Sequence, residues 1–297
     1  MDASDRSTER PGRRGALLVV LAAALWGSTG TAQAKGPGGL DSLAVGGTRI
    51  ALGAIGLALV AAVRGDLRTI RRVPRATLAV GSIGVAAYQL CFFAAVRRAG
   101  VAVGTVVAIG SAPAFAGVLG WWRRAEPIRA RWLAATVLAL AGGALLVLAG
   151  GAGRHVAPLG VALALGAGLS YAVYALASKE ALGHVPSAAA MAALFGGGAL
   201  LLLPLVVFRP LGWIGTGRGS LMVLHLGLVT VTVAYLLYAA GLRHVALGAS
   251  ATLSLAEPAT ATVLATIVLG EHLGRAQWGG LALVAAGLAL LATGGSH

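Results

Sequence analysis

The sequence predicts an all-α, polytopic membrane protein with ten transmembrane helices arranged as two inverted five-helix repeats. Three observations support this prediction. Of the 297 residues, 58% are hydrophobic and 11% are charged, and the mean hydropathy is +0.87, whereas soluble domains carry about 25% charged residues. Apolar runs of about 20 residues recur, each long enough to cross a hydrocarbon core of about 30 Å as a helix. The chain also matches itself at an offset of 145 residues.

Segments rich in charge, proline or glycine divide the apolar runs into ten candidate helices. A membrane β-barrel is excluded, because its strands of about 10 residues would alternate in polarity. The sequence therefore divides into a tail over 1–14, a first repeat over 15–150 and a second repeat over 157–293. The predicted helices span residues 15–34, 43–63, 76–96, 101–121, 132–150, 157–178, 187–208, 219–241, 245–269 and 276–293.

The first apolar run also has the features of a secretory signal peptide. It starts with Arg13 and Arg14, continues through an apolar stretch, and ends in a small-residue pattern over 32–34. The internal repeat argues against this alternative, because cleavage would remove a helix that the first repeat needs.

The basic residues indicate the orientation of the chain. The formal net charge of +14 does not indicate a nucleic-acid partner, because the positive charges sit in short clusters between apolar runs. With residue 1 in the cytoplasm, most of the 23 lysines and arginines fall on the cytoplasmic side, so both termini are expected there. These residues are Arg6, Arg10, Arg13, Arg14, Arg64, Arg68, Arg71, Arg72, Arg75, Arg123, Arg124, Arg129, Arg131, Lys179 and Arg243.

The internal match at 145 residues pairs scarce residue types without a gap. Because each half contains five helices, an odd number, the two halves must have opposite orientations in the membrane. Inverted repeats with a binding site near the midplane are typical of secondary transporters. The matched pairs are Arg98 with Arg243, Pro113 with Pro258, Glu126 with Glu271, Gly142 with Gly287, and the aromatic residues Trp26 with Tyr171.

Several segments resemble one family of membrane proteins. They are "LAAALWGSTGTAQAK", "AVGGTRIALGAI", "YQLCFFAAVRRAGVAVGTVV", "LSYAVYALASK" and "LLYAAGLRHVALGASATLSLAEPATATVLATIVLGEHL". Together they resemble EamA-type members of the drug/metabolite transporter superfamily, over about residues 15 to 293. The resemblance implies export of small metabolites, often amino acids, across the bacterial inner membrane, with the aromatic amino-acid exporters as the nearest group. It also implies a central cavity lined mainly by the helices over 15–34, 76–96, 101–121, 157–178, 219–241 and 245–269.

Glu257 is the first candidate for a functional residue. It lies 12 residues from each end of the predicted 245–269 helix, near the middle of the bilayer, where a carboxylate is costly unless it faces a cavity or a partner. It can therefore bind a substrate or a proton, or it is a hydrogen-bonded strut beside the kink at Pro258. Pro258 is expected to free the carbonyl of Ser254 for a solute, and Pro113 is expected to kink the matching helix.

Two further ionisable residues lie within predicted helices. Arg49 can pair with Glu257 or with a substrate carboxylate, because its guanidinium forms two parallel hydrogen bonds to a carboxylate. Alternatively, Arg49 caps carbonyls or extends toward the interface. His225 lies about two turns into its helix and can titrate near neutral pH, or it is a satisfied histidine near the membrane surface.

A set of aromatic and amide side chains completes the predicted site. Aromatic residues make up 5% of the chain, and several lie well within helices instead of at the interfaces. Two tyrosine pairs have a spacing of three, which places each pair on one helix face. Each single residue is equally explained by packing. The candidates are Trp26, Tyr88, Gln89, Tyr171, Tyr174, Tyr235 and Tyr238.

Other function classes lack their motifs. No phosphate-binding GxxxxGK[ST] loop is present, and neither H-E-x-x-H, a paired-aspartate site nor a G-x-S-x-G serine site occurs within the apolar runs. We therefore expect no catalytic residue, metal or cofactor. A secondary transporter with alternating access is the leading hypothesis, with small molecules, possible protons and the lipid bilayer as partners and a monomer as the expected state. A lipid or lipid-carrier flippase on the same fold is the alternative, and a membrane-embedded enzyme is a third.

Overall fold

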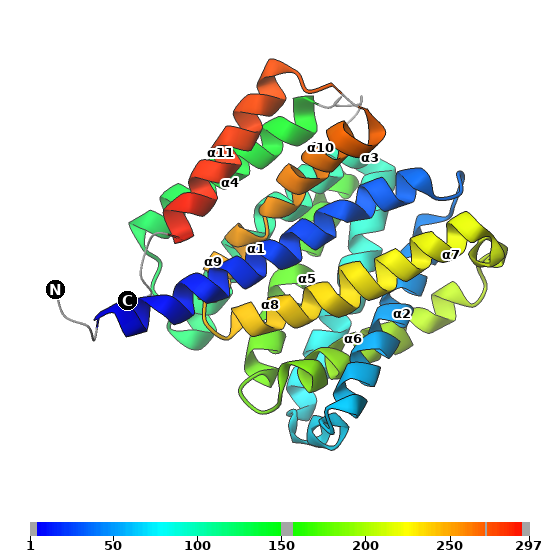
Figure 1. Cartoon of the computed structure of the whole chain (residues 1–297), viewed down its shortest axis with the longest axis horizontal. Coiled ribbons are helices and arrows are strands. Elements are labelled where there is room, and N and C mark those ends of the chain that lie inside the picture. The colour runs from blue at the N-terminus through cyan, green and yellow to red at the C-terminus, as the bar shows by residue number, and fades with distance from the viewer. Residues whose placement is uncertain (1–4, 150–156, 271, 293–297) are drawn as a thin grey trace.

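The computed structural model describes residues 5–149, 157–270 and 272–292, and this part of the chain is helical without a strand (Figure 1). The all-α prediction is confirmed. The helices are α1 (Asp5–Lys35), α2 (Ser42–Val63), α3 (Arg75–Arg124), α4 (Ala130–Ala149), α5 (Pro158–Ala181), α6 (Ser187–Val206), α7 (Gly217–Leu224), η3 (His225–Val233), α8 (Ala234–Leu242), α9 (Leu247–Leu253), α10 (Ala256–Leu269) and α11 (Arg275–Ala292), with short turns η1 (Leu67–Arg72) and η2 (Gly212–Gly215).

These elements form 10 candidate membrane spans within the described residues. α3 contributes two of them, because Gly100 adopts a φ of 82° and breaks the helix between Arg75–Gly100 and Val103–Arg124. One span combines α7, η3 and α8, and another combines α9 and α10. The spans agree with the predicted ranges to within a few residues.

The packing of the helices follows the two repeats. In Figure 1, α1 lies between α10 and α8, and it contacts both. The equivalent helix of the second half, α5, packs against α3, which holds the two spans equivalent to those formed by α7–α8 and α9–α10. The remaining helices pair with their own equivalents, α2 with α6 and α4 with α11. The core therefore lies between the halves.

α4 and α11 approach each other closely at glycines. A Cβ atom on Gly142 would lie 2.6 Å from the carbonyl oxygen of Gly280, and one on Gly287 would lie 2.7 Å from that of Ala135. These two contacts are equivalent under the 145-residue offset. Small residues at such crossings let helix backbones pack tightly in a membrane, where the hydrophobic effect does not drive association.

α1 is part of the bundle core. Val19, Ala22 and Ala23 are fully buried, so the apolar run that resembles a signal peptide is an integral helix of the first half. We use the name basic end for the end of the bundle where α1 begins and where the α2–α3, α3–α4, α5–α6 and α8–α9 connections lie. The predicted cytoplasmic arginines cluster there.

Candidate functional site

The structure brings the predicted aromatic residues together in the core between the halves. The rings come from α1, α3, α5 and α8, and all except the partly buried Tyr88 are at most 8% exposed. Trp26 lies 5.0 Å from Tyr235 and 5.4 Å from Tyr238 between ring centroids. We call this set the ring cluster: Trp26, Tyr88, Tyr171, Tyr174, Tyr235 and Tyr238.

The tyrosine hydroxyl groups of α5 and α8, two helices of the second repeat, form hydrogen bonds with one another and with nearby serines. The hydroxyl of Tyr174 lies 3.1 Å from that of Tyr235. The hydroxyl of Tyr171 lies 2.9 Å from Oγ of Ser254, which itself donates to the carbonyl of Ser250. Because buried hydroxyl groups are costly when unpaired, this network fixes the ring positions.

The α9–α10 span is interrupted at Ser254 and Leu255, three residues before Pro258. The carbonyl of Ser254 accepts a hydrogen bond from the backbone N–H of Glu257 at 3.0 Å. It is therefore not free, and the sequence-based expectation of an available Ser254 carbonyl was wrong. Pro258 lies in the first turn of α10, where a missing N–H leaves no intrahelical bond unmade. Pro113, by contrast, lies inside the continuous Val103–Arg124 span.

The break gives Glu257 a special position. Its carboxylate lies in the first turn of α10, close to the middle of the Leu247–Leu269 span. Helix N-termini carry a partial positive charge, which stabilises a carboxylate there. No hydrogen bond or ion pair of its side chain occurs with the described residues.

Arg49, on α2, is the oppositely charged neighbour. Arg49 is close enough for its charge to influence Glu257, Tyr88 and Tyr235, so it lies within electrostatic range of the ring cluster. Arg49 and Glu257 form no ion pair within 4.0 Å, and Nε of Arg49 is buried without a hydrogen-bond partner. Nε1 of Trp26 is likewise buried and unpartnered. Two buried donors and one carboxylate are thus unpaired around the same rings.

Two predicted residues lie elsewhere. Gln89 is 4% exposed, and its Oε1 lies 3.3 Å from where a Cβ on Gly46 would stand, so the side chain packs at the α2–α3 interface. His225 hydrogen-bonds through Nε2 to Oγ of Ser28 at 2.8 Å. It lines a cavity of about 470 Å³ with Lys35 and Arg218, at the end opposite the basic end. Neither residue contacts Glu257.

Two features of the site escaped the sequence analysis. Phe195 of α6 packs 4.1 Å from Tyr235 between ring centroids. Its position in an apolar run does not distinguish it from a packing residue of the helix. The segment His225–Val233 is a π-helix that leads directly to Tyr235. Its wider turns change the direction of the following side chains, and such segments are common at functional sites. The run of β-branched valine and threonine over 229–233 lowers the helix propensity, and it is the sequence feature that coincides with this irregular segment.

Comparisons with known proteins place this geometry in a family. A solved crystal structure superposes with a TM-score of 0.81 over 93% of this chain and 95% of that chain, at 23% sequence identity, so it shows the fold. The sequence profile of the EamA-like transporter family matches residues 13–148 and 158–293. The chain belongs to the EamA-like transporter family.

Relatives of this EamA transporter include two bacterial proteins. The uncharacterized transporter YwfM of Bacillus subtilis (strain 168) is 40% identical over 275 residues, which cover 93% of this chain and 92% of the relative. An uncharacterized transporter of Clostridium kluyveri is 31% identical over 119 residues, 39% of this chain and 38% of the relative. The protein is therefore a multi-pass membrane transporter, as predicted.

At the basic end of the EamA transporter, a contact between Glu126 and Lys179 joins the two halves. Oε1 of Glu126, from the first half, lies 2.7 Å from Nζ of Lys179, and its Oε2 accepts from the backbone N–H of Leu247 at 2.6 Å. Nζ of Lys179 also donates to the carbonyl of Val245. The partner of Glu126 therefore comes from α5, 53 residues along the chain. The equivalent Glu271 lies outside the described residues.

Loss of this contact is expected to destabilise the protein. Replacing Lys179 by glutamine leaves a mostly buried carboxylate without its cation, which costs about 2 kcal/mol. The thermal midpoint in detergent, followed by tryptophan fluorescence, should fall by roughly 5 °C. Arg209→Gln is the control, because its ion pair with Asp41 is 42% and 28% exposed and such pairs contribute about 0–1 kcal/mol. Equal midpoints for the two variants would show that the contact adds little.

A glycine sets the distance between α1 and Glu257. A Cβ on Gly27 would lie 2.7 Å from the carbonyl oxygen of Glu257 and 2.8 Å from Cβ of Thr260. Gly27→Ala therefore pushes α10 away from α1, with an expected loss of about 1–3 kcal/mol that lowers the thermal midpoint. Gly30→Ala is the control one turn away, since nothing lies within 4 Å of its Cβ position. A tolerated Gly27→Ala would contradict the close packing.

Proposed function

We propose that this EamA transporter exports amino acids in their zwitterionic form, by alternating access, across the bacterial inner membrane. The observation that carries the proposal is the pair formed by Arg49 and Glu257. Opposite charges near mid-membrane normally pair, because an isolated charge there is costly. Here Arg49 lies within electrostatic range of Glu257, but no ion pair within 4.0 Å joins them. A ligand with one negative and one positive group would provide a partner for each of them.

The remaining groups suggest how an amino acid would bind. Its carboxylate would accept from Nε of Arg49 and from Nε1 of Trp26, which are two of the buried donors without partners. Its ammonium group would bind Glu257, and its side chain would contact the ring cluster. Aromatic faces favour a large apolar or aromatic side chain. The same arrangement disfavours a lipid-carrier phosphate, because Glu257 would repel its negative charges.

Glu257 also offers a route for proton coupling. One carboxylate can bind either a substrate ammonium or a proton, so the two would exchange at the same oxygen atoms. Export coupled in this way takes a proton inward for each amino acid released outward. Acidifying the outside of substrate-loaded proteoliposomes should therefore accelerate efflux. Efflux that ignores the pH gradient would favour a facilitative carrier.

The proposed cycle starts from a state closed at the basic end. Glu126 and Lys179 join the halves there, and the cavity that His225 lines opens at the other end. With the basic end in the cytoplasm, as the arginine distribution predicts, the structure resembles an outward-directed state with the ring cluster still packed. Opening the basic end would require Lys179 to leave Glu126.

Counterflow tests the proposed substrate class. Proteoliposomes that contain the purified protein are preloaded with one unlabelled solute and placed in trace labelled phenylalanine or tryptophan. Preloaded aromatic or large apolar amino acids should drive transient accumulation of the label, whereas sugars, polyamines and dicarboxylates should not. If no amino acid drives counterflow while a solute of another class does, the assignment is wrong.

A further inference from the structure

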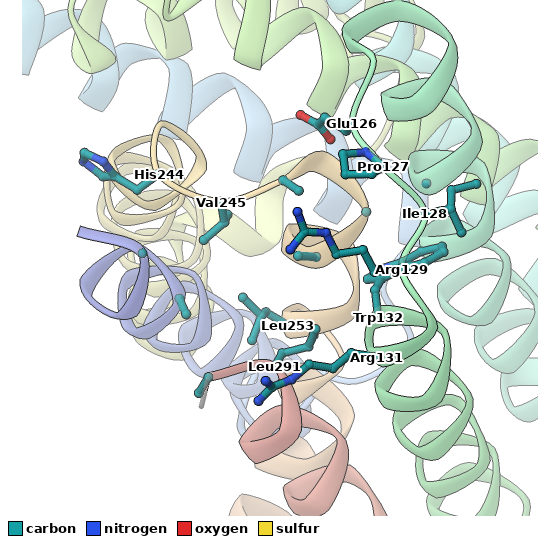
Figure 2. Close-up of a pocket in the computed structure, with 17 residues that line it drawn as sticks. Glu126, Pro127, Ile128, Arg129, Arg131, Trp132, His244, Val245, Leu253 and Leu291 are labelled. Carbon is teal, nitrogen blue, oxygen red and sulfur yellow. The ribbon is translucent and has the colours of Figure 1, made fainter. Parts of the chain in front are cut away.

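A pocket of about 360 Å³ at the basic end belongs neither to the ring cluster nor to the Arg49–Glu257 pair. It is formed by α1, the α3–α4 and α8–α9 connections, α9 and α11 (Figure 2). In Figure 2 the guanidinium of Arg129 points toward the middle of the pocket, with Leu253 and Leu291 below it. Glu126 also lines the pocket, but its charge is already paired with Lys179.

A second cavity of about 560 Å³ lies between α1 and α11. The two cavities adjoin, because both are lined by Ala16, Leu253 and Ala292. We call them together the groove. Arg13 and Arg14 are exposed at its end, and Leu17 lies one turn deeper and is 58% exposed. Residues four apart lie on one helix face, so α1 presents a cation and then apolar surface along the groove.

Apart from Glu126, which is paired with Lys179, the charged residues along this groove are positive. Arg129, Arg13 and Arg14 make no ion pair or hydrogen bond with the described residues, and Arg131 at the pocket wall donates to the carbonyl of Leu290. Deeper in the groove, the lining is apolar and includes Leu288. Basic groups at the membrane surface followed by an apolar channel match a molecule with an anionic head and hydrocarbon chains.

We propose that the groove binds one anionic phospholipid. Its phosphate lies between Arg129 and the arginines of α1, and its acyl chains follow α1 and α11 into the bilayer. Pockets of this kind between helices bind anionic headgroups by charge, and neutral headgroups lack that attraction. The bound lipid joins elements of both halves beside the Glu126–Lys179 contact. It therefore stabilises the closed basic end.

Native mass spectrometry of the detergent-solubilised full-length protein tests this directly. With phosphatidylglycerol added, the wild-type protein should retain one tightly bound lipid, and phosphatidylcholine should bind at least about tenfold more weakly. Arg13→Gln combined with Arg129→Gln should weaken phosphatidylglycerol binding about tenfold, because each surface cation contributes to lipid attraction. Arg68→Gln combined with Arg71→Gln removes the same charge from exposed positions in η1 and should leave binding unchanged.

Four results would overturn the proposal. These are equal binding of the two lipids, equal losses in both double variants, displacement of the lipid by inorganic phosphate at matched concentration, and displacement by the amino acid that drives counterflow. The last result would make the groove a substrate vestibule. Gel filtration and the thermal midpoint without added lipid check that both variants fold. Lipid binding is measured without transport. A negative result in this experiment would therefore contradict the lipid proposal without contradicting the proposed export function.

Discussion

Glu257→Gln is expected to lower the initial rate of amino-acid efflux from proteoliposomes about 100-fold while leaving the protein folded. Glutamine keeps the size and hydrogen-bonding capacity of the side chain but loses its charge. Losing one member of a desolvated charge contact costs about 2–5 kcal/mol, and about 1.4 kcal/mol corresponds to a factor of ten. The substitution also removes the group that would carry the proton, so a pH gradient should no longer change the remaining efflux.

Glu180→Gln provides the matched control for this experiment. Glu180 is a partly buried carboxylate near the end of α5, nearly two helical turns beyond the ring cluster residue Tyr174. Its replacement should leave efflux within about twofold, a change worth less than 0.5 kcal/mol. If Glu257→Gln transports as fast as wild type and still responds to the gradient, Glu257 is a structural carboxylate and the proposed mechanism fails.

Arg49→Gln should raise the KM for the transported amino acid about 100-fold, because the variant loses the cation that would bind the carboxylate. Arg49→Lys keeps the charge but cannot form two parallel hydrogen bonds, so its KM should rise only about tenfold. Arg64→Gln, at the exposed end of α2, is the control for charge loss on the same helix. Equal defects for the lysine and glutamine variants would indicate that Arg49 acts through helix packing instead of through its charge.

The ten spans were predictable because membrane crossing sets a minimum apolar length, and that length is visible in a single sequence. The ring cluster was partly predictable for a related reason. Tyr171 and Tyr174, and likewise Tyr235 and Tyr238, are spaced by three residues and must share a helix face. The internal repeat then placed Trp26 at the depth of Tyr171, and the structure brings all of them together.

What escaped the sequence depended on contacts between distant segments. The partner of Glu126 is Lys179, 53 residues away, and no local pattern reveals it. Whether the Ser254 carbonyl is hydrogen-bonded depends on where the helix is interrupted. A kink at Pro258 within a continuous helix would leave this carbonyl without an intrahelical donor. Because the helix instead breaks before Ala256, the backbone N–H of Glu257 donates to it. Gln89 follows Tyr88 directly, so the helix turns its side chain to another face.

The central claim, that Arg49 and Glu257 bind the two charged groups of one substrate, is tested most directly by competition among three solutes with the same side chain. Phenylalanine, its amide without a carboxylate, and 3-phenylpropionate without an amine would each compete with labelled phenylalanine efflux in wild-type proteoliposomes. Unlabelled phenylalanine should compete at least about 100-fold more strongly than either analogue, because each analogue leaves one buried charge unpaired. Competition by the amide or by 3-phenylpropionate at the strength of phenylalanine itself would contradict the account.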